Sequence, residues 1–135
     1  QCSNSTLCLN DVSQELMHLA ALGTTRKAWV PLVTQVLKAP TRTAQRKLLM
    51  PLVPKVRESV QSAMDYAHTV QLVLEQLVIS QAVRHIAAAN ATVGGVSGIV
   101  LTGGTALNVR LSHAVYSHFQ LPVHVPAAPH DAGLS

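Results

Sequence analysis

Two adjacent glycines, Gly103 and Gly104, stand where a short apolar run meets a helical pattern. Glycine lets backbone N–H groups approach a ligand closely, and the start of a helix favours a phosphate group. The Thr105 hydroxyl adds a donor, and Asn108, expected one turn into the helix, could reach a ribose or a phosphate. Tight strand-to-helix turns also use Gly-Gly for geometry alone, and the stretch matches neither the Walker A pattern nor the dinucleotide fingerprint. The residues alone leave both a phosphate cradle and a simple hinge open.

A carboxylate, Asp131, follows the second apolar run, within an expected loop from Pro126 to Gly133. Parallel strands end at one edge of a sheet, so Asp131 is well placed for a metal ion or a phosphate-bound cation. It could equally cap a following helix. None of the seven histidines forms an i, i+4 pair, the spacing of helical metal sites. His130, next to Asp131, is the best candidate among them.

Prolines, glycines and apolar spacing divide the chain into helices followed by strands. The expected helices are Glu15–Ala21, Trp29–Leu37, Thr41–Leu49, Val56–Ala89 and Ala106–Phe119. The expected strands are Ser97–Leu101, which should be buried, and the short Leu121–Val125. The Val56–Ala89 pattern has a wide apolar face and is long enough for two helices. The order of elements predicts an α/β fold with a small parallel sheet.

Two strands do not make a stable sheet alone, so we expect a fragment of a larger domain or a chain that needs a partner. Its helical part would cover residues 11–92, and its strand–glycine loop–helix–strand part residues 97–135.

The composition is that of a folded chain with few groups for nucleic-acid recognition. Apolar residues make up 48% and charged residues 12%, and the aromatic residues are too few for base stacking. Eight basic residues lie between Arg26 and Arg57 with no acid among them. Such a cluster can attract phosphates, but without a recognised nucleic-acid module we interpret it as a solvated helical face and expect no nucleic-acid partner.

The cysteines and the apolar runs bear on the compartment. The spacing of Cys2 and Cys8 matches no zinc-binding or redox motif, and a single disulfide between them would not stabilise a domain of this size. A reducing, cytoplasmic location is therefore expected. The longest apolar stretch, Val70–Ile79, is interrupted by three polar residues, so we expect no membrane span.

Four stretches in order are similar to one known family. They are "ELMHLAALG" (Glu15–Gly23), "DYAHTVQLVLEQLV" (Asp65–Val78), "IVLTGGTALN" (Ile99–Asn108) and "VPAAPHDAGLS" (Val125–Ser135). Together they resemble the N-terminal catalytic domain of the O-carbamoyltransferases, the nodulation-factor and antibiotic-tailoring enzymes. The resemblance covers nearly the whole chain from Glu15, and "GGxALN" followed by "DAG" is its most specific part.

The resemblance implies an actin-like (ribonuclease-H-like) ATPase fold, of which this chain is the later part. It also implies transfer of a carbamoyl group from carbamoyl-adenylate, made from ATP and carbamoyl phosphate, to a hydroxyl acceptor. By analogy Gly103, Gly104, Thr105 and Asn108 bind the nucleotide, and Asp131 binds a divalent metal, expected to be iron. The metal would polarise the carbamoyl carbonyl.

Departures from the family pattern limit what this chain can do alone. His18 and Leu22 replace a glycine and a tyrosine of the first motif, Thr105 replaces a valine, and His130 replaces the glycine before the aspartate. The family's upstream metal-binding histidines, first phosphate-binding strands and adenylate-forming domain have no counterpart in these 135 residues. We therefore expect the chain to be inactive by itself and to need the missing segments as partners.

Two alternatives remain at this stage. The chain could be a non-catalytic remnant that serves as an interaction module. It could also belong to another branch of the same superfamily, the tRNA threonylcarbamoyl-transfer or hydrogenase-maturation proteins, which share the fold. The basic segment from Arg26 to Arg57 is the feature that would favour tRNA binding.

Overall fold

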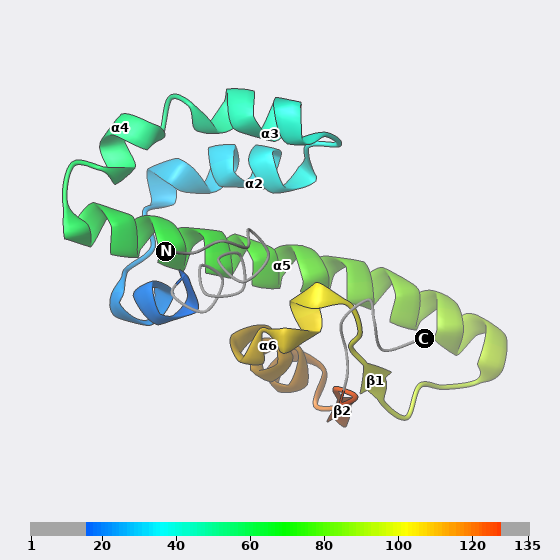
Figure 1. Ribbon diagram of the computed structural model, residues 1–135. Helices are drawn as coiled ribbons and strands as arrows, with labels where there is room; N and C mark the ends of the chain where they lie inside the picture. Colours follow the sequence, from blue (N-terminus) through cyan, green and yellow to red (C-terminus); the bar gives the residue numbers. More distant parts are fainter. Residues whose placement is uncertain (1–15, 128–135) are drawn as a thin grey trace. The chain divides into compact units, whose positions relative to one another are not determined.

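A computed structural model of the protein describes residues 16–127 (Figure 1). The chain divides into two compact units. One unit ends at Val73 and the other begins at Leu74, so the boundary lies inside a long helix, and each unit is described by itself. The chain is rich in helix and has a small parallel sheet, as the α/β class requires. None of the helices within residues 16–127 has the length and hydropathy of a membrane span.

The first unit consists of helices whose ends follow local signals. It contains a helical segment over residues 16–22, the 3-10 helix η1 (Lys27–Trp29), α2 (Val30–Lys38), α3 (Arg42–Leu49), the short α4 (Val53–Val56) and the first part of α5 (Val60–Val93). Pro31 lies in the first turn of α2, where its missing N–H breaks no helical bond. The Thr41 hydroxyl accepts a hydrogen bond from the Ala44 N–H at 3.2 Å and caps α3. The expected helices Trp29–Leu37 and Thr41–Leu49 are confirmed to within a residue at each end, as is the described part of Glu15–Ala21, whereas η1 and α4 were not predicted. Helices α2 and α3 lie side by side (Figure 1).

The long helix α5 is one helix, and it begins later than the apolar pattern predicted. The Ser59 hydroxyl accepts the Ser62 N–H at 3.0 Å and caps the first turn, which starts at Val60. The expected start at Val56 is wrong because that residue ends the separate turn α4. A serine cap downstream of two prolines therefore sets the boundary.

The core of the first unit mixes aliphatic and polar side chains. Its buried apolar residues are Ala20, Trp29, Val33, Val36, Leu52, Ala67 and Val73. Its buried polar residues all come from α5: Ser62, Asp65, Thr69 and Gln71. Ser62, Asp65, Thr69 and Val73 recur at intervals of three or four residues and therefore lie on one face of the helix. The wide apolar face predicted for this helix is wrong in detail, since Val60 is 70% exposed and the buried face is partly polar.

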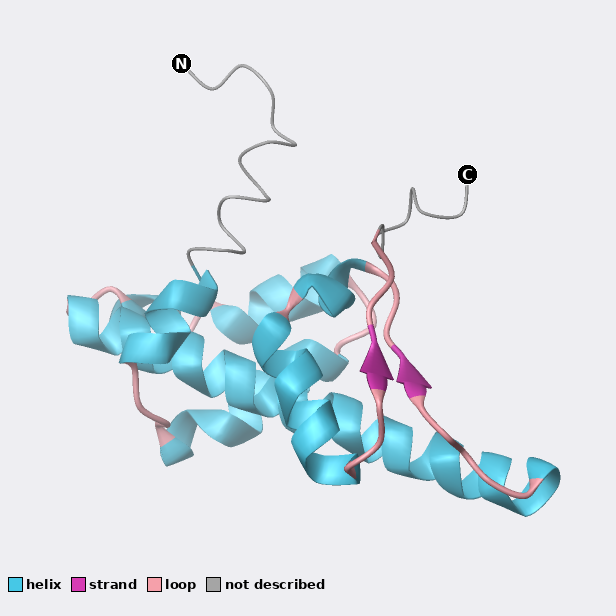
Figure 2. Cartoon of the chain, turned by 90° about the horizontal axis from the view of Figure 1, so that it is seen from below, coloured by secondary structure: helices cyan, strands magenta, loops and turns pink. Residues whose placement is uncertain are grey.

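The second unit contains a strand, a turn, a helix and a second strand. β1 (Ile99–Val100) runs parallel to β2 (Val123–His124), with Ile99 opposite Val123. The two strands point the same way side by side (Figure 2). Between them lie the 3-10 helix η2 (Gly104–Leu107) and α6 (Val109–Phe119), which buries Leu111 and Val115. The predicted order and parallel pairing are confirmed, although both strands are shorter than predicted.

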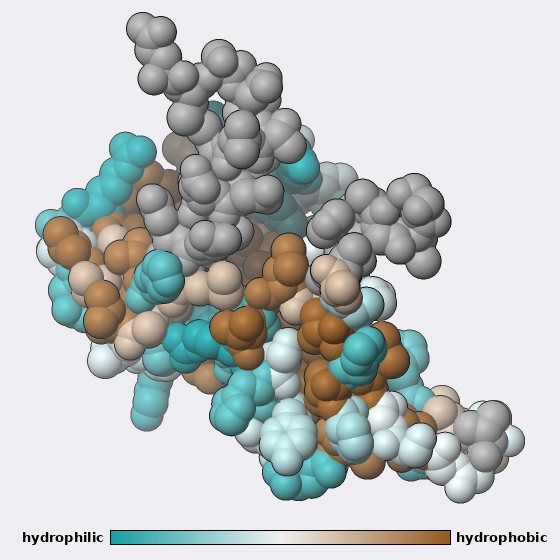
Figure 3. All heavy atoms as spheres, turned by 60° about the horizontal axis from the view of Figure 1, so that its bottom comes forward, coloured by the Kyte–Doolittle hydropathy of each residue, from teal (hydrophilic) through white to brown (hydrophobic). Residues whose placement is uncertain are grey.

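The prediction that β1 is buried is wrong for half of the strand. Val100 is 63% exposed, while Ile99 is half-buried. Among the described residues the sheet has only two strands, so β1 pairs with another strand along one edge only. Other apolar side chains of this unit are exposed as well, including Leu107, Val109 and Tyr116. Hydrophobic residues are visible at the surface in the space-filling view (Figure 3).

Gly23 lies directly against the backbone of α5, and this contact yields a test of the first unit. A Cβ at this position would overlap the Met64 carbonyl group and press on the Asp65 backbone nitrogen. Because helix backbone does not move aside easily, we expect Gly23→Ala to lower the free energy of unfolding by about 1–3 kcal/mol or more. Urea unfolding followed by circular dichroism measures this. The control is Gly104→Ala, whose Cβ would meet no atom within 4 Å, and equal losses in both variants would contradict the close approach.

Candidate functional site

The glycine turn (residues 101–108) joins the end of β1 to the start of α6. Gly103 has φ +81° and ψ 176°, a conformation that side chains other than hydrogen rarely tolerate. The Gly103 carbonyl accepts the Ala106 N–H at 3.0 Å, and the Thr105 carbonyl accepts the Asn108 N–H at 3.0 Å. Gly103 is therefore needed by the backbone itself, which is the hinge role that the sequence left open.

Gly104 differs from Gly103 because the fold gives no reason for a glycine there. It opens η2, its φ does not lie in the left-handed region, and an added Cβ would meet no atom within 4 Å. Thr105 beside it is exposed. The N–H groups of Gly104 and Thr105 stand at the start of a 3-10 turn, where N–H groups have no partner within the turn. A ligand that reached the turn would therefore find backbone donors that no bond within the turn uses.

Asn108 is not one turn into a helix, as predicted, but is the residue that starts α6. It has extended backbone angles, and its Oδ1 accepts the Leu111 N–H at 3.0 Å. The expected helix from Ala106 breaks because Gly104–Leu107 forms a 3-10 turn that ends at Asn108. The Asn108 side chain therefore has a capping role in α6, and any ligand contact would have to be made in addition to it.

The predicted metal ligand lies outside the described part of the chain, as does its neighbour. Residues 128–135, which include Asp131 and His130, are not described, so the position predicted for them stays a prediction. Within residues 16–127, no group of three histidine, cysteine or acidic side chains is arranged to hold a metal. His68 has a structural role instead, because its Nδ1 lies 2.8 Å from the Ala20 carbonyl oxygen and donates to it.

Arg110 is a candidate site residue that the sequence reasoning missed. It lies in the first turn of α6, two residues after Asn108, and is half-buried. Its Nε is 4.0 Å from Glu75 Oε1, a long ion pair. The sequence signal was available, since a basic residue just after a glycine turn adds positive charge where a phosphate would bind.

A second polar cluster, also missed, surrounds the buried Asp65 of α5. Its carboxylate accepts hydrogen bonds from Thr24 N–H (3.0 Å), Thr24 hydroxyl (3.1 Å), Arg26 Nε (2.8 Å) and Gln61 Nε2 (2.8 Å). These hydrogen bonds hold the pKa of Asp65 well below its usual range. The bond from the Thr24 N–H has the largest effect, followed by the bonds from Gln61 and Arg26. With every donor coming from the protein, this carboxylate is arranged to hold the 24–26 segment on α5 rather than to bind a substrate.

No family model, curated protein or solved structure matches this chain. A function is therefore inferred from its motifs and from the geometry of the glycine turn.

The Asp65 cluster predicts a pH dependence of stability. The folded-state pKa lies below the unfolded value of about 3.9, so the stabilisation is complete above about pH 5 and is lost as the pH falls. We expect Asp65→Asn to lower the melting temperature at pH 7. The difference in melting temperature between this variant and the wild type should become smaller as the pH approaches 3, because the wild type loses the stabilisation by Asp65. Thermal unfolding between pH 3 and 7 measures this.

Glu58→Gln provides the matched control, because Glu58 is exposed and forms no ion pair with any described residue. This variant should keep the acid sensitivity of the wild type. An Asp65→Asn variant with the same acid sensitivity as wild type would show that the cluster does not carry it.

Proposed function

We propose that this chain is part of the catalytic domain of an O-carbamoyltransferase with an actin-like ATPase fold. In this proposal the glycine turn binds the phosphates of ATP or of the carbamoyl-adenylate made from ATP and carbamoyl phosphate. The acceptor is a hydroxyl group of a small molecule, and the enzyme is cytoplasmic. The ordered motifs of the sequence suggest the family, and the turn geometry supports the nucleotide role.

The topology of the second unit supports the position of the site. The glycine turn leaves the carboxyl end of β1, and β2 runs parallel to β1, so its carboxyl end lies at the same edge. Ligands of open α/β sheets bind outside this edge. The segment that leads to Asp131 also starts there, after His124.

The single observation that carries the proposal is the open space at Gly104. Neither its backbone conformation nor its packing requires a glycine, yet the position has none of the side-chain atoms that would cover the turn. A glycine of this kind is explained when a ligand approaches the backbone. The N–H groups of Gly104 and Thr105 would then donate to phosphate oxygens, and Arg110 would add positive charge in the next turn.

The metal of the proposal is a divalent ion of iron type. Asp131 is its candidate ligand in this chain, and one carboxylate does not hold a transition metal, so its other ligands would come from segments outside this chain. When bound, the metal supplies Lewis-acid polarisation of the carbamoyl carbonyl. The residues described here would bind and orient the nucleotide only, so the chain alone should bind it without transferring a carbamoyl group.

Titration of the 135-residue chain with ATP by calorimetry tests the nucleotide role. We expect Gly104→Ala to weaken ATP binding at least tenfold, because its methyl group occupies the space next to the phosphates, while the melting temperature stays unchanged. Gly94→Ala is the control for glycine substitution elsewhere in the same unit. Gly94 has open space around it, as Gly104 does, but its φ is positive (+79°), so this variant should lose stability but keep ATP affinity.

The role of Asn108 needs a variant that retains the cap. Asn108→Ser keeps an oxygen for the Leu111 N–H, whereas Asn108→Ala loses it at a cost of about 1 kcal/mol. If the Asn108 amide contacts the nucleotide, both variants weaken ATP binding, and only the alanine variant also loses stability. Absence of saturable ATP binding to the wild-type chain, or full affinity in Gly104→Ala, would overturn the proposal and favour a non-catalytic interaction module.

A further inference from the structure

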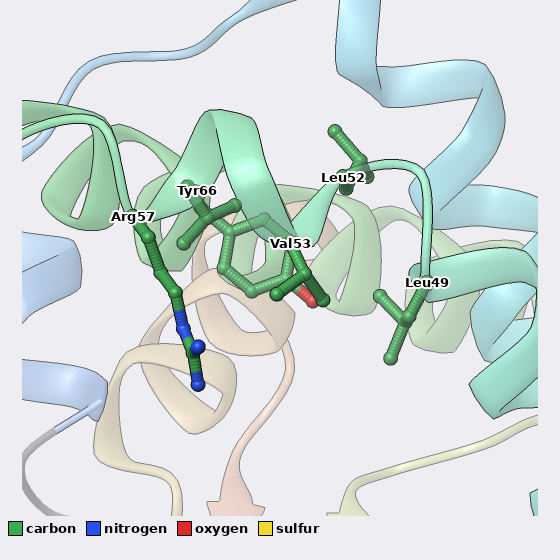
Figure 4. A pocket seen from close by; sticks show the side chains of 6 residues that line it. Leu49, Leu52, Val53, Arg57 and Tyr66 are labelled. Carbon is green, nitrogen blue, oxygen red and sulfur yellow. The ribbon is translucent and has the colours of Figure 1, made fainter.

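A cavity in the first unit lies between α3, α4 and α5, apart from the glycine turn. Its volume is about 220 Å³, and its lining consists of Leu49, Leu52, Val53, Val56, Arg57 and Tyr66. Val53 and Tyr66 both line the cavity, and Arg57 lies to one side of them in the view of Figure 4. A cavity of about 150 Å³ already admits benzene, so this one has room for a single ring with a short substituent.

The one charged group of the lining is Arg57, which is exposed at the edge of the cavity. Within the described part of the chain Arg57 forms no ion pair, not even with the neighbouring Glu58. The sequence from Leu16 to Arg57 contains no acid at all. A guanidinium at the edge of apolar walls is suited to a carboxylate, which it can bind with two parallel hydrogen bonds.

Tyr66 gives the cavity a second polar group. Its hydroxyl makes no hydrogen bond to any described residue, although the residue is half-buried. Burial raises the pKa of the Tyr66 hydroxyl, so it stays protonated and able to donate at neutral pH. The lining therefore offers two donors, Arg57 and Tyr66, and otherwise aliphatic walls, and it contains no acidic side chain that would favour a cation.

We propose that this cavity binds a small organic carboxylate with a compact apolar body, such as an arylalkanoate. The carboxylate pairs with Arg57, and the body packs against Leu49, Val53, Val56 and the ring of Tyr66. The site lies wholly in the first unit, and its occupancy does not depend on whether the glycine turn binds a nucleotide.

The chain carries its own reporter for this site. Trp29 is the only tryptophan, and its ring centroid lies 6.3 Å from that of Tyr66 in an edge-to-face arrangement. The Arg26 guanidinium lies over the Trp29 ring, 5.1 Å from its centroid. A ligand that moves the Tyr66 ring changes the surroundings of Trp29, so tryptophan fluorescence reports binding.

The test is a fluorescence titration of the 135-residue chain with 3-phenylpropionate and with 3-phenylpropan-1-ol, which has a similar body and no charge. We expect saturable binding of the carboxylate, at least tenfold tighter than binding of the alcohol. Arg57→Gln should remove this preference, since it deletes the charge and leaves the aliphatic walls in place. Because Arg57 is exposed, the variant should fold, and circular dichroism checks that it does.

Two further variants separate the cavity from general surface charge. Arg46→Gln is the matched control, because Arg46 is an exposed arginine of α3 outside the lining. It should bind both compounds as the wild type does. Val53→Phe should weaken both compounds, because the larger ring fills the cavity. Equal affinity for acid and alcohol, equal losses in the two arginine variants, or no saturable binding would each overturn the proposal.

Discussion

The arrangement of the first unit depends on the carboxylate of Asp65. Burying a carboxylate without hydrogen-bond partners costs far more free energy than the packing of one helix contact returns. The donors to Asp65 must therefore be in place whenever the unit is folded. Three of its four bonds come from Thr24 and Arg26, about forty residues earlier in the chain. The carboxylate therefore selects one position of the 24–26 segment along α5, a specificity that aliphatic contacts alone would not provide.

Neighbouring contacts reinforce the same position. The Thr69 hydroxyl, one turn after Asp65, accepts the Arg26 N–H at 3.0 Å, and His68 donates to the Ala20 carbonyl. Arg26 also places its guanidinium over Trp29, which contacts Tyr66 edge to face. A single line of contacts thus runs from the buried carboxylate to the ring that lines the cavity. The interactions that position the 24–26 segment on α5 therefore connect to Tyr66, which lines the cavity.

Sequence reasoning succeeded where the deciding interaction is local. Pro31 and the Thr41 cap fix helix ends within one turn, and both ends were predicted. It failed where distant residues decide. The pairing of Arg26 with Asp65 joins residues 39 apart and has no spacing signature, so the residue pattern does not predict it, although Arg26 is exposed as expected for a solvated basic face. The predicted helix start at Ala106 failed for a different reason, since the conformations of Gly103 and Asn108 cannot be read from the residue types alone.

The four motifs of the family resemblance carry different kinds of information. In the structure the first motif meets the second: Ala20 bonds to His68, and Gly23 packs against the α5 backbone at Met64 and Asp65. Packing therefore accounts for these residues of both stretches. A protein with the same helical arrangement but another activity would need them for the same reason. Gly104 has no such explanation within the fold. The weight of a carbamoyltransferase assignment therefore rests on the third and fourth motifs, and a ligand at the glycine turn bears on it more directly than further likeness in the helical part.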